Sequence, residues 1–324
     1  MANFDLRYIN LDQATQRRTM VEQSYGQSRF SQRWSFERFS AVSAESDLVR
    51  DAPGRLSGPY KGNFLSHMTC VRQSLDSDAH LFVVEDDVQF CDQTGPILEG
   101  MVDTMAEDAW DVIRTEISLL SAVDFPKIYK LSVSAAGREK VRLLNLGGID
   151  CPGTGASAYI VNRQSKRKFI QMMDAMVVRN GGLNAPFDVC LHEMIRHKFL
   201  LGYVTVPFLT APSFHADETQ APVMTADQAT PQDEMLRRFN QKLLELMSAF
   251  RRLVWIGYTP DKVLPGSYGA GNDLFRMTEQ DVLYQKISSW MLILQQNIPY
   301  SSDFRLQPPE ITRDISPYCD GMAQ

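Results

Sequence analysis

The sequence has few cysteines and no long apolar run. Its five cysteines are widely and irregularly spaced over 324 residues and include no Cys-x-x-Cys pair, which argues against a zinc ribbon or a disulfide framework. The longest apolar run, Trp290 to Leu294, falls far short of the ~18 residues that a membrane-spanning helix needs. Residues 1–5 lack the basic and apolar segments of a secretory signal, and no Asn-x-Ser/Thr acceptor occurs. We therefore expect a cytoplasmic protein without a transmembrane segment.

The chain also has no excess of basic residues. Lys and Arg number 33 against 39 Asp and Glu, which gives a net charge of −6. Because nucleic-acid binding depends on cations that neutralise phosphates, this balance argues against a nucleic-acid partner. It does not argue against a local basic pocket.

The first two thirds of the chain alternate strand-like and helix-like segments, a pattern typical of an α/β fold. The expected strands are residues 6–11, 36–42, 80–84, 110–113, 158–161 and 199–206. Asn63 is expected to cap an amphipathic helix over residues 64–75, in which apolar residues recur at helical spacing.

The composition changes after about residue 219. A Pro/Ala/Thr-rich stretch over 221–232 is followed by two helical apolar stripes, within 235–253 and 278–296. We expect an α/β domain over 1–220 and a helical appendage over 221–324. The appendage would pack on the core, contribute to the acceptor side or form a homodimer interface, with a membrane surface as the alternative.

The sharpest local signal is an acidic triplet. Four apolar residues, 81–84, predict a buried strand, and Glu85, Asp86 and Asp87 follow it directly. Neighbouring carboxylates raise one another's pKa unless a cation neutralises them. Oxygen ligands suit Mg²⁺ or Mn²⁺, and ligands of an open α/β sheet bind at the carboxyl ends of its strands. The triplet favours a metal site, and a solvated acidic loop is the alternative.

Several short segments occur in a distinctive order and spacing. They are Tyr8–Leu11 with Arg17-Arg18, Phe36–Val42, Gly62–His67, Val83–Val88, Trp110–Ile113, Gly153–Val161 and Pro186-Phe187-Asp188. This series, over about residues 5–219, resembles glycosyltransferase family 25, the lipooligosaccharide-type sugar transferases and their collagen-modifying relatives. The combination of Ser66-His67 with the acidic triplet is its most specific part, and the appendage is not covered.

The resemblance implies a GT-A fold, with a Rossmann-like sheet that carries an acidic metal-binding motif. It further implies transfer of a sugar, often galactose, from a UDP-sugar to an acceptor hydroxyl with inversion. Asp87 would ligate the Mn²⁺ or Mg²⁺ that bridges the two phosphates, because a divalent cation stabilises the leaving diphosphate. Asp86 and Glu85 would contact the metal, its water, the ribose or the sugar. The acceptor, whether a glycan, a lipid-linked sugar, a small molecule or a protein, is left open.

The nucleotide would lie where the first two strands end. Asn10 and Leu11 would meet the base and ribose, and the backbone of Ala41 and Val42 would line the base pocket. The family usually continues with Asp-Gly, whereas this chain has Ser43-Ala44. The contacts that the family makes to the nucleoside at these two positions are therefore not carried over to this chain.

Basic and polar residues near the strand ends are candidates for the diphosphate. Arg17 or Arg18 could bind it, since arginine makes charge-assisted bonds to phosphate, and we expect one in the site and the other in solvent. Either could instead be an ordinary surface charge. Ser66 and His67 are expected in the first turn of the 64–75 helix, where an anion is favoured. His67 could bind the donor, hold the acidic triplet or simply pack on the strand below.

The remaining candidates lie later in the chain. Asp188 is the candidate general base for the acceptor hydroxyl, and a helix N-cap is its alternative role. Thr154 and Gly155 would allow close approach to the donor sugar or acceptor. His215 could ligate Mn²⁺ or be a solvent-exposed loop residue.

Two other functions remain open. One is a non-catalytic relative that keeps the fold for binding or assembly. The other is a metal-dependent phosphoryl-transfer enzyme or hydrolase that uses the same acidic triplet.

Overall fold

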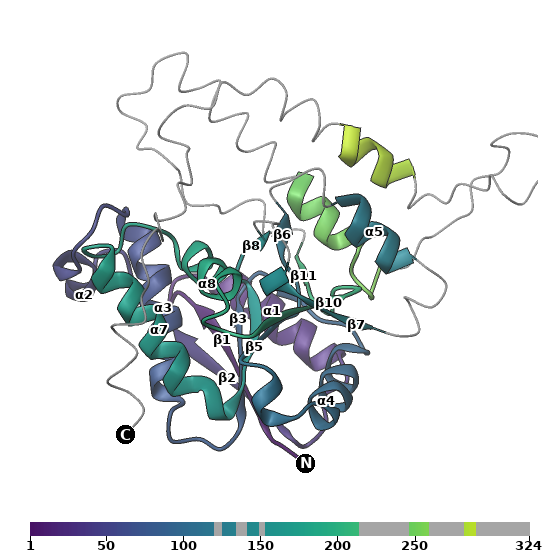
Figure 1. Ribbon diagram of the computed structural model, residues 1–324, viewed down its shortest axis with the longest axis horizontal. Helices are drawn as coiled ribbons and strands as arrows, with labels where there is room; N and C mark the ends of the chain where they lie inside the picture. The colour runs from purple at the N-terminus through teal and green to yellow at the C-terminus, as the bar shows by residue number, and fades with distance from the viewer. Residues whose placement is uncertain (120–124, 134–140, 149–152, 214–245, 259–281, 290–324) are drawn as a thin grey trace, which may run out of the picture.

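The computed structural model describes residues 1–119, 125–133, 141–148, 153–213, 246–258 and 282–289. A seven-stranded sheet in the order β2-β1-β3-β9-β5-β10-β7 forms the centre of the molecule (Figure 1). Its strands are β1 (Phe4–Asn10), β2 (Trp34–Ser40), β3 (His80–Glu85), β5 (Val112–Arg114), β7 (Arg142–Asn145), β9 (Ala158–Val161) and β10 (Gly202–Val206). Only β9 and β7 run against the other five. The predicted α/β class is therefore confirmed.

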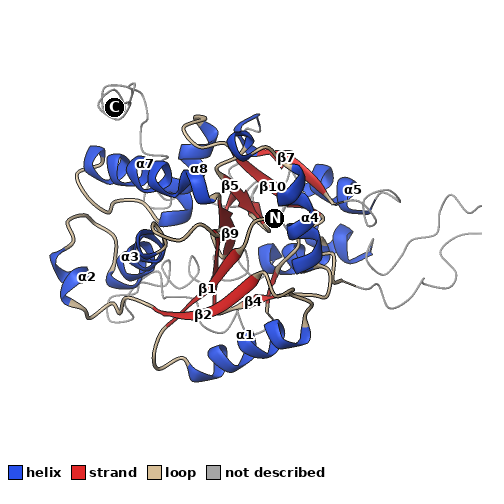
Figure 2. Ribbon diagram, turned by 90° about the horizontal axis from the view of Figure 1, so that it is seen from below, coloured by secondary structure: helices blue, strands red, loops and turns tan. Residues whose placement is uncertain are grey.

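Helices cover both faces of this sheet. On one side lie α3 (Gly58–Gln73), α7 (Lys166–Arg179) and α8 (Phe187–Arg196), and on the other lie α1 (Thr15–Gln27) and α4 (Thr94–Thr104) (Figure 2). The remaining helices are α2 (Asp47–Asp51), α5 (Phe125–Val133) and the 3₁₀ turns η1 (Glu107–Ala109), η2 (Leu146–Gly148) and η3 (Arg163–Ser165). None of the helices in the described ranges is long and apolar enough to cross a lipid bilayer.

Strand β3 shows why the sheet is buried on both faces. Leu81 and Val83 pack into the core under α3, α7 and α8, while Phe82 and Val84 pack into the second core under α1. All four are fully buried. Because successive side chains of a strand point to opposite faces, a continuous apolar run suits a central strand between two helical layers.

Two short ladders extend the carboxyl edge of the sheet. One joins β4 (Val88–Gln89) to β11 (Ala211–Pro212), and the other joins β6 (Ser118–Leu119) to β8 (Gly153–Thr154). Strands β4, β6 and β11 follow β3, β5 and β10, and β8 precedes the antiparallel β9.

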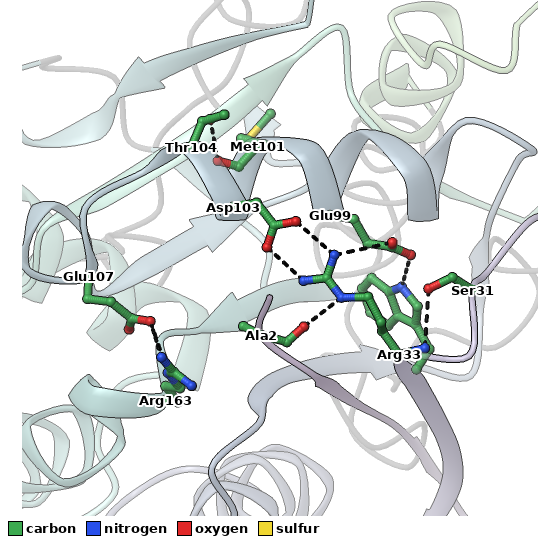
Figure 3. A network of polar contacts seen from close by, with 10 residues as sticks. Ala2, Ser31, Arg33, Glu99, Met101, Asp103, Thr104, Glu107 and Arg163 are labelled. Carbon is green, nitrogen blue, oxygen red and sulfur yellow. Dashed lines mark hydrogen bonds and ion pairs between the residues drawn. The ribbon is translucent and has the colours of Figure 1, made fainter.

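The opposite, amino edge is fastened by an arginine. Arg33 donates to the Ala2 carbonyl at 2.7 Å and to both carboxylate oxygens of Asp103 at 2.7 and 2.8 Å (Figure 3). The neighbouring Trp34 indole donates to Glu99 at 2.7 Å. These contacts tie the start of β1 and β2 to α4, far from the acidic triplet.

Residues 246–258 belong to the core around the sheet. Phe250, Leu253 and Val254 are almost fully buried in the same cluster as α3 and α8. The predicted packing of this apolar stripe on the core is confirmed for the described residues, including Ile287 of the second helix. The division of the chain at residue 220 stays a prediction.

All six predicted strands are present; β9 has the predicted ends, and the ends of the other five are shifted by up to three residues. Strand β7 was not predicted. The predicted helix over 64–75 is wrong at its start, because α3 begins at Gly58 and has Pro59 in its first turn. Proline is favoured at the first positions of a helix because it needs no hydrogen-bond acceptor there.

Candidate functional site

The candidate site lies at the carboxyl edge of β1, β2 and β3, where the acidic triplet follows β3. The Glu85 N–H donates to the Ser157 carbonyl and the Ser213 N–H donates to the Asp87 carbonyl, both at 2.7 Å. Neighbouring segments thus fix both ends of the triplet. The three carboxylates lie in different surroundings, which give them different pKa values.

Glu85 is held in its charged form by donors. Its Oε1 accepts a hydrogen bond from Asn63 Nδ2 at 2.8 Å and lies 3.2 Å from His67 Nε2. Burial disfavours the charge, but these donors and the nearby Arg251 guanidinium outweigh it and lower the pKa of Glu85 to about 2. The side chain remains 29% exposed, so a ligand can still reach this carboxylate.

The carboxylate of Asp86 is bound by two side chains of the protein itself. Its Oδ2 accepts from Asn10 Nδ2 at 2.7 Å, and its Oδ1 accepts from Arg17 Nη1 at 2.8 Å. Burial raises the pKa of Asp86, although Arg17 and Asn10 act against this shift. Since both oxygens already have partners, Asp86 is a weaker candidate for direct metal ligation than Asp87.

Asp87 is the carboxylate with an orphaned oxygen. Its buried Oδ1 accepts no hydrogen bond in the part of the chain that the structure describes, and Arg17 Nη2 approaches Oδ2 only to 4.0 Å. Burial and the charges of Glu85 and Asp86 raise the pKa of Asp87 to about 7, although Arg17 opposes the shift. A carboxylate that has one buried, unpaired oxygen and lies beside two other carboxylates is unfavourable unless a cation binds it.

These residues fit a divalent cation that is completed by a substrate. Within the described ranges, no group of three or more His, Cys, Asp or Glu residues is arranged to hold a metal ion. Magnesium sites commonly use only one or two protein carboxylates and complete the shell with water and phosphate oxygens. Asp87, with its orphaned oxygen, meets that pattern. His215, the other predicted ligand, lies outside the described residues.

His67 connects the triplet to the core. Its ring is fully buried and stacks on Phe187 with centroids 4.3 Å apart, and its Nδ1 lies 3.0 Å from the Tyr159 hydroxyl. Burial raises the pKa of Tyr159 well above its ordinary value, so the hydroxyl keeps its proton. The two ring nitrogens of His67 therefore join the Tyr159 hydroxyl to Glu85 Oε1. His67 thus holds the triplet and also packs on the core, two of the three roles considered for it.

The expected anion site at a helix start is wrong. Because α3 begins at Gly58, Ser66 and His67 lie in the middle of that helix, away from its N-terminal N–H groups. Ser66 instead ties α3 to the segment after β2. Its hydroxyl accepts from the Val42 N–H at 2.8 Å and donates to the Gly62 carbonyl at 2.7 Å.

The predicted nucleotide residues lie together at the ends of β1 and β2. The Ala41 N–H donates to the Asn10 carbonyl at 3.0 Å, and Leu11 and Val42 follow as half-buried residues. Arg18 Nε lies 3.4 Å from Asn10 Oδ1.

Arg17 and Arg18 of α1 are both half-buried beside this edge. Arg17 binds Asp86, and Arg18 lies against Asn10. The expected split, with one arginine in the site and one in solvent, is therefore wrong, because both side chains fold back over the end of β1.

Asp188 is hydrogen-bonded to Gly155, another of the predicted site residues. It lies in the first turn of α8, whose N-cap is Pro186, so its alternative role as the N-cap is wrong. Its Oδ2 accepts from the Gly155 N–H at 2.8 Å, and the Gly155 carbonyl accepts from Arg114. Gly155 has a φ of 83°, and a Cβ there would lie 2.8 Å from Ser118 Oγ, so only glycine suits this bridge. Thr154 precedes it in β8.

Two arginines of the site, the half-buried Arg251 and the buried Arg114, were not predicted. Arg251, from residues 246–258, donates Nε to Glu116 Oε2 at 2.9 Å. Arg114 ends β5 and donates to Gly155; burial lowers its pKa to about 10, against the charge of Asp188. The sequence feature that could have identified Arg114 and Glu116 is their position just after the predicted strand of residues 110–113. Arg251 had no such signal, because its helix is far away in sequence.

Comparison with known proteins gives the family. The family model for glycosyltransferase family 25, described as an LPS biosynthesis protein, matches residues 7–190. No curated protein shows significant similarity to the chain.

Three solved glycosyltransferases illustrate how distant the structural likeness is. The galactosyltransferase LgtC, solved with donor and acceptor sugar analogs, is 15% identical with a TM-score of 0.32 over 59% of this chain and 70% of its own. GlyE of Streptococcus pneumoniae TIGR4 is 7% identical with a TM-score of 0.35 over 91% and 63%. Mouse xyloside xylosyltransferase 1 is 9% identical with a TM-score of 0.33 over 62% and 71%. Likeness at this level gives no information about the substrate.

The family match and the fold agree with each other. The match spans more than half of the chain and includes β1, β3, the acidic triplet and Asp188. The mainly parallel sheet, with this triplet at its carboxyl edge, agrees with the GT-A-type core that the family resemblance implies. The chain belongs to glycosyltransferase family 25.

Proposed function

We propose that the chain is an inverting, metal-dependent glycosyltransferase that moves a sugar from a UDP-sugar to an acceptor hydroxyl. Asp87 carries the proposal, because its buried Oδ1 has no partner among the described residues and lies at the strand edge where such a fold binds its ligands. Galactose is the first donor sugar to test, since the resemblance to family 25 implies it.

The charges near Asp87 support a divalent cation. Four carboxylates face two guanidinium groups there, a formal excess of two negative charges; they are Glu85, Asp86, Asp87 and Glu116 against Arg17 and Arg251. Asp87 would hold Mn²⁺ or Mg²⁺, with Glu85 and Asp86 beside it. When bound, the cation would supply Lewis-acid stabilisation of the leaving diphosphate.

The chain's own residues would bind and orient the donor. Arg17 contacts Asp86 and approaches Asp87 while remaining half-buried, so its guanidinium is placed to meet a phosphate beside the triplet. The nucleoside would lie at the ends of β1 and β2. Because the N–H groups of Ala41 and Val42 already have partners, it would be recognised there by carbonyl groups and by the shape of the edge.

Asp188 is our candidate for the general base. Gly155 fixes its Oδ2, whereas its Oδ1 makes no hydrogen bond to the described residues and is not sealed from solvent. That oxygen could accept the proton of the acceptor hydroxyl during transfer. The acceptor class that the family description favours is the glycan of a lipopolysaccharide, with lipid-linked and small-molecule acceptors as alternatives.

A donor screen tests this function. The full chain would be incubated with Mn²⁺, a panel of UDP-sugars and a lipooligosaccharide acceptor, and UDP release would be measured with and without excess EDTA. We expect UDP release with one donor, above all UDP-galactose, and its loss in EDTA. Release of free phosphate would support a hydrolase, and no turnover by the folded protein would support a non-catalytic relative.

A further inference from the structure

Arg251 reaches the site from a part of the chain that the family model does not match. The match ends at residue 190, and Arg251 lies on the helix of residues 246–253. Its Nε donates to Glu116 Oε2 at 2.9 Å, and its Nη2 donates to Glu116 Oε1 and to the Ser157 hydroxyl. The same Ser157 accepts the Glu85 N–H through its carbonyl, so Arg251 is joined to the end of β3 through one residue.

The position of this helix is well defined by packing. Phe250 and Leu253, on either side of Arg251, are each only 1% exposed. The chain after the helix runs beside Phe208, which donates to the Val254 carbonyl at 3.1 Å and accepts from the Ile256 N–H at 2.9 Å. Arg251 therefore occupies a fixed place in the site.

Only one edge of the Arg251 guanidinium is used by the protein. Nε and Nη2 face Glu116, while Nη1 makes no hydrogen bond within the described residues and is not sealed from solvent. Ser157 joins the Arg251 guanidinium to the Glu85 N–H, so the charge of Arg251 lies at the end of β3 beside the acidic triplet. Arginine can bind an oxyanion through a free edge while the other edge stays paired.

The pair with Glu116 accounts for one edge of the guanidinium. Glu116 is fully buried and needs a positive partner. Because that pair uses Nε and Nη2, Nη1 remains available to a ligand at the end of β3.

We propose that Arg251 binds a phosphate group of the nucleoside diphosphate through Nη1, opposite Arg17 and beside the cation site at Asp87. This inference rests on the proposed function, since it takes the donor to carry a diphosphate. The site is then built from two parts of the chain, the acidic edge within residues 7–190 and one arginine from residues 246–258.

Binding of UDP and of uridine to the full chain tests the proposal. In Mn²⁺, we expect Arg251→Met to weaken UDP binding by about 10- to 100-fold, the effect of one charge-assisted contact, and to leave uridine binding nearly unchanged. Arg251→Lys should fall between the two, because a lysine keeps the charge but not the geometry. A merely structural arginine would reduce binding of both ligands equally.

Two further variants separate binding from folding. The double variant Arg251→Met with Glu116→Gln avoids leaving Glu116 charged and unpaired, and it should show the same selective loss of UDP binding. Arg163→Met is the matched control, because Arg163 also pairs with a glutamate, Glu107, but at the amino edge of the sheet (Figure 3). It should bind UDP as the wild type does.

The outcome distinguishes the inference from the proposed function. If the wild type binds UDP and Arg251→Met binds it equally well, the inference fails and the proposed function stands. If the wild type binds no UDP, the proposed function fails, and binding of pyrophosphate with Mn²⁺ decides the role of Arg251. Equal pyrophosphate binding by wild type and variant, or none by the wild type, overturns the inference.

Discussion

Asp188 and Gly155 are joined by a hydrogen bond of 2.8 Å from the Gly155 N–H to Asp188 Oδ2. The bond fixes the carboxylate without using its second oxygen. Gly155 also accepts from the buried Arg114, so the peptide between these two charged groups is held from both sides. A general base needs this combination of a fixed position and a free oxygen.

Replacing Asp188 by Asn should remove the base while keeping the structure. An Asn Oδ1 can still accept the Gly155 N–H, so we expect the fold to be kept, with some loss in the free energy of unfolding because the buried Arg114 loses the nearby charge of Asp188. Sugar transfer should fall by about 10²- to 10⁴-fold, the usual effect of losing a general base. Rates of UDP release and of product formation, with UDP-sugar affinity measured separately, check this.

Gly155→Ala tests the support of Asp188. An alanine would need a positive φ and would crowd Ser118, so we expect a loss of activity together with a loss of stability.

The result for Asp188→Asn can contradict the assignment of the base in two ways. If this variant keeps wild-type transfer, another acid is the base. If it loses donor binding or does not fold, Asp188 is a structural residue.

Replacing Asp87 by Asn should have opposite effects on activity and stability. Without metal, Asp87 is a half-buried carboxylate whose Oδ1 is buried without a partner among the described residues, next to Glu85 and Asp86. Removing its charge should raise the free energy of unfolding by about 1–3 kcal/mol at pH 8 in EDTA, because burial and the neighbouring charges disfavour the charged carboxylate and raise its pKa to about 7. Transfer should be nearly abolished, because the cation would lose its main ligand.

Urea unfolding in EDTA and in Mn²⁺ measures the stability of both proteins, and UDP release measures their transfer activity. Mn²⁺ should stabilise the wild type and leave Asp87→Asn unchanged, since a ligand stabilises only the protein that binds it. Equal stabilisation of both proteins by Mn²⁺ would place the metal elsewhere.

Local sequence patterns were sufficient for the acidic edge and for every strand of the main sheet except β7, which was not predicted. Strand β9, residues 158–161, was predicted with its correct ends because four apolar residues stand between two polar ones. Glu85, Asp86 and Asp87 were placed correctly because they directly follow such a run, and a strand end is a local feature. The start of α3 was missed because two glycines, at 58 and 62, hide its helical pattern.

Contacts between distant segments could not be predicted in the same way. Arg251 and Glu116 are separated by 135 positions, and the apolar stripe of the 246–253 helix shows only that it is buried somewhere. Asp188 and Gly155 were both candidates, but their direct contact depends on where α8 packs. Such pairs are set by tertiary packing, which no local pattern records.

Gly62 shows how packing overrides helix propensity, and it predicts a measurable cost. A Cβ at Gly62 would lie 2.5 Å from the Val42 carbonyl oxygen, so Gly62→Ala must push α3 away from the end of β2. We expect a loss of about 1–3 kcal/mol in the free energy of unfolding and weaker UDP binding.

Gly100→Ala is the matched control for Gly62→Ala. Gly100 lies within α4, and a Cβ there would meet no atom within 4 Å. This variant should be more stable by about 0.5–1 kcal/mol, because alanine is the better helix former. Destabilisation of both variants to the same extent would mean that the close contact at Val42 is not the cause.

A buried histidine predicts how stability depends on pH. His80 is 1% exposed, lies between the rings of Phe4 and Trp110, and accepts the Arg163 N–H through Nδ1 at 3.2 Å. Burial lowers the pKa of His80 to about 4, from an ordinary value of 6.5. Between these values the unfolded chain binds a proton at this residue and the folded chain does not. The free energy of unfolding contributed by His80 therefore falls as the pH falls from about 6.5 to 4.

His80→Asn isolates this contribution. An Asn side chain can keep the acceptor for Arg163 but cannot take up a proton, so it removes the titration along with some packing. Near pH 5, the slope of unfolding free energy against pH should be smaller in the variant by about 1.4 kcal/mol per pH unit, the effect of one proton. His192 and Asp87 also titrate in this range, but both are present in the two proteins, so their effects cancel in the difference. Urea unfolding of both proteins at half-unit steps from pH 4 to 7 measures the two slopes. Equal slopes would mean that His80 takes up its proton in the folded protein as readily as in the unfolded chain.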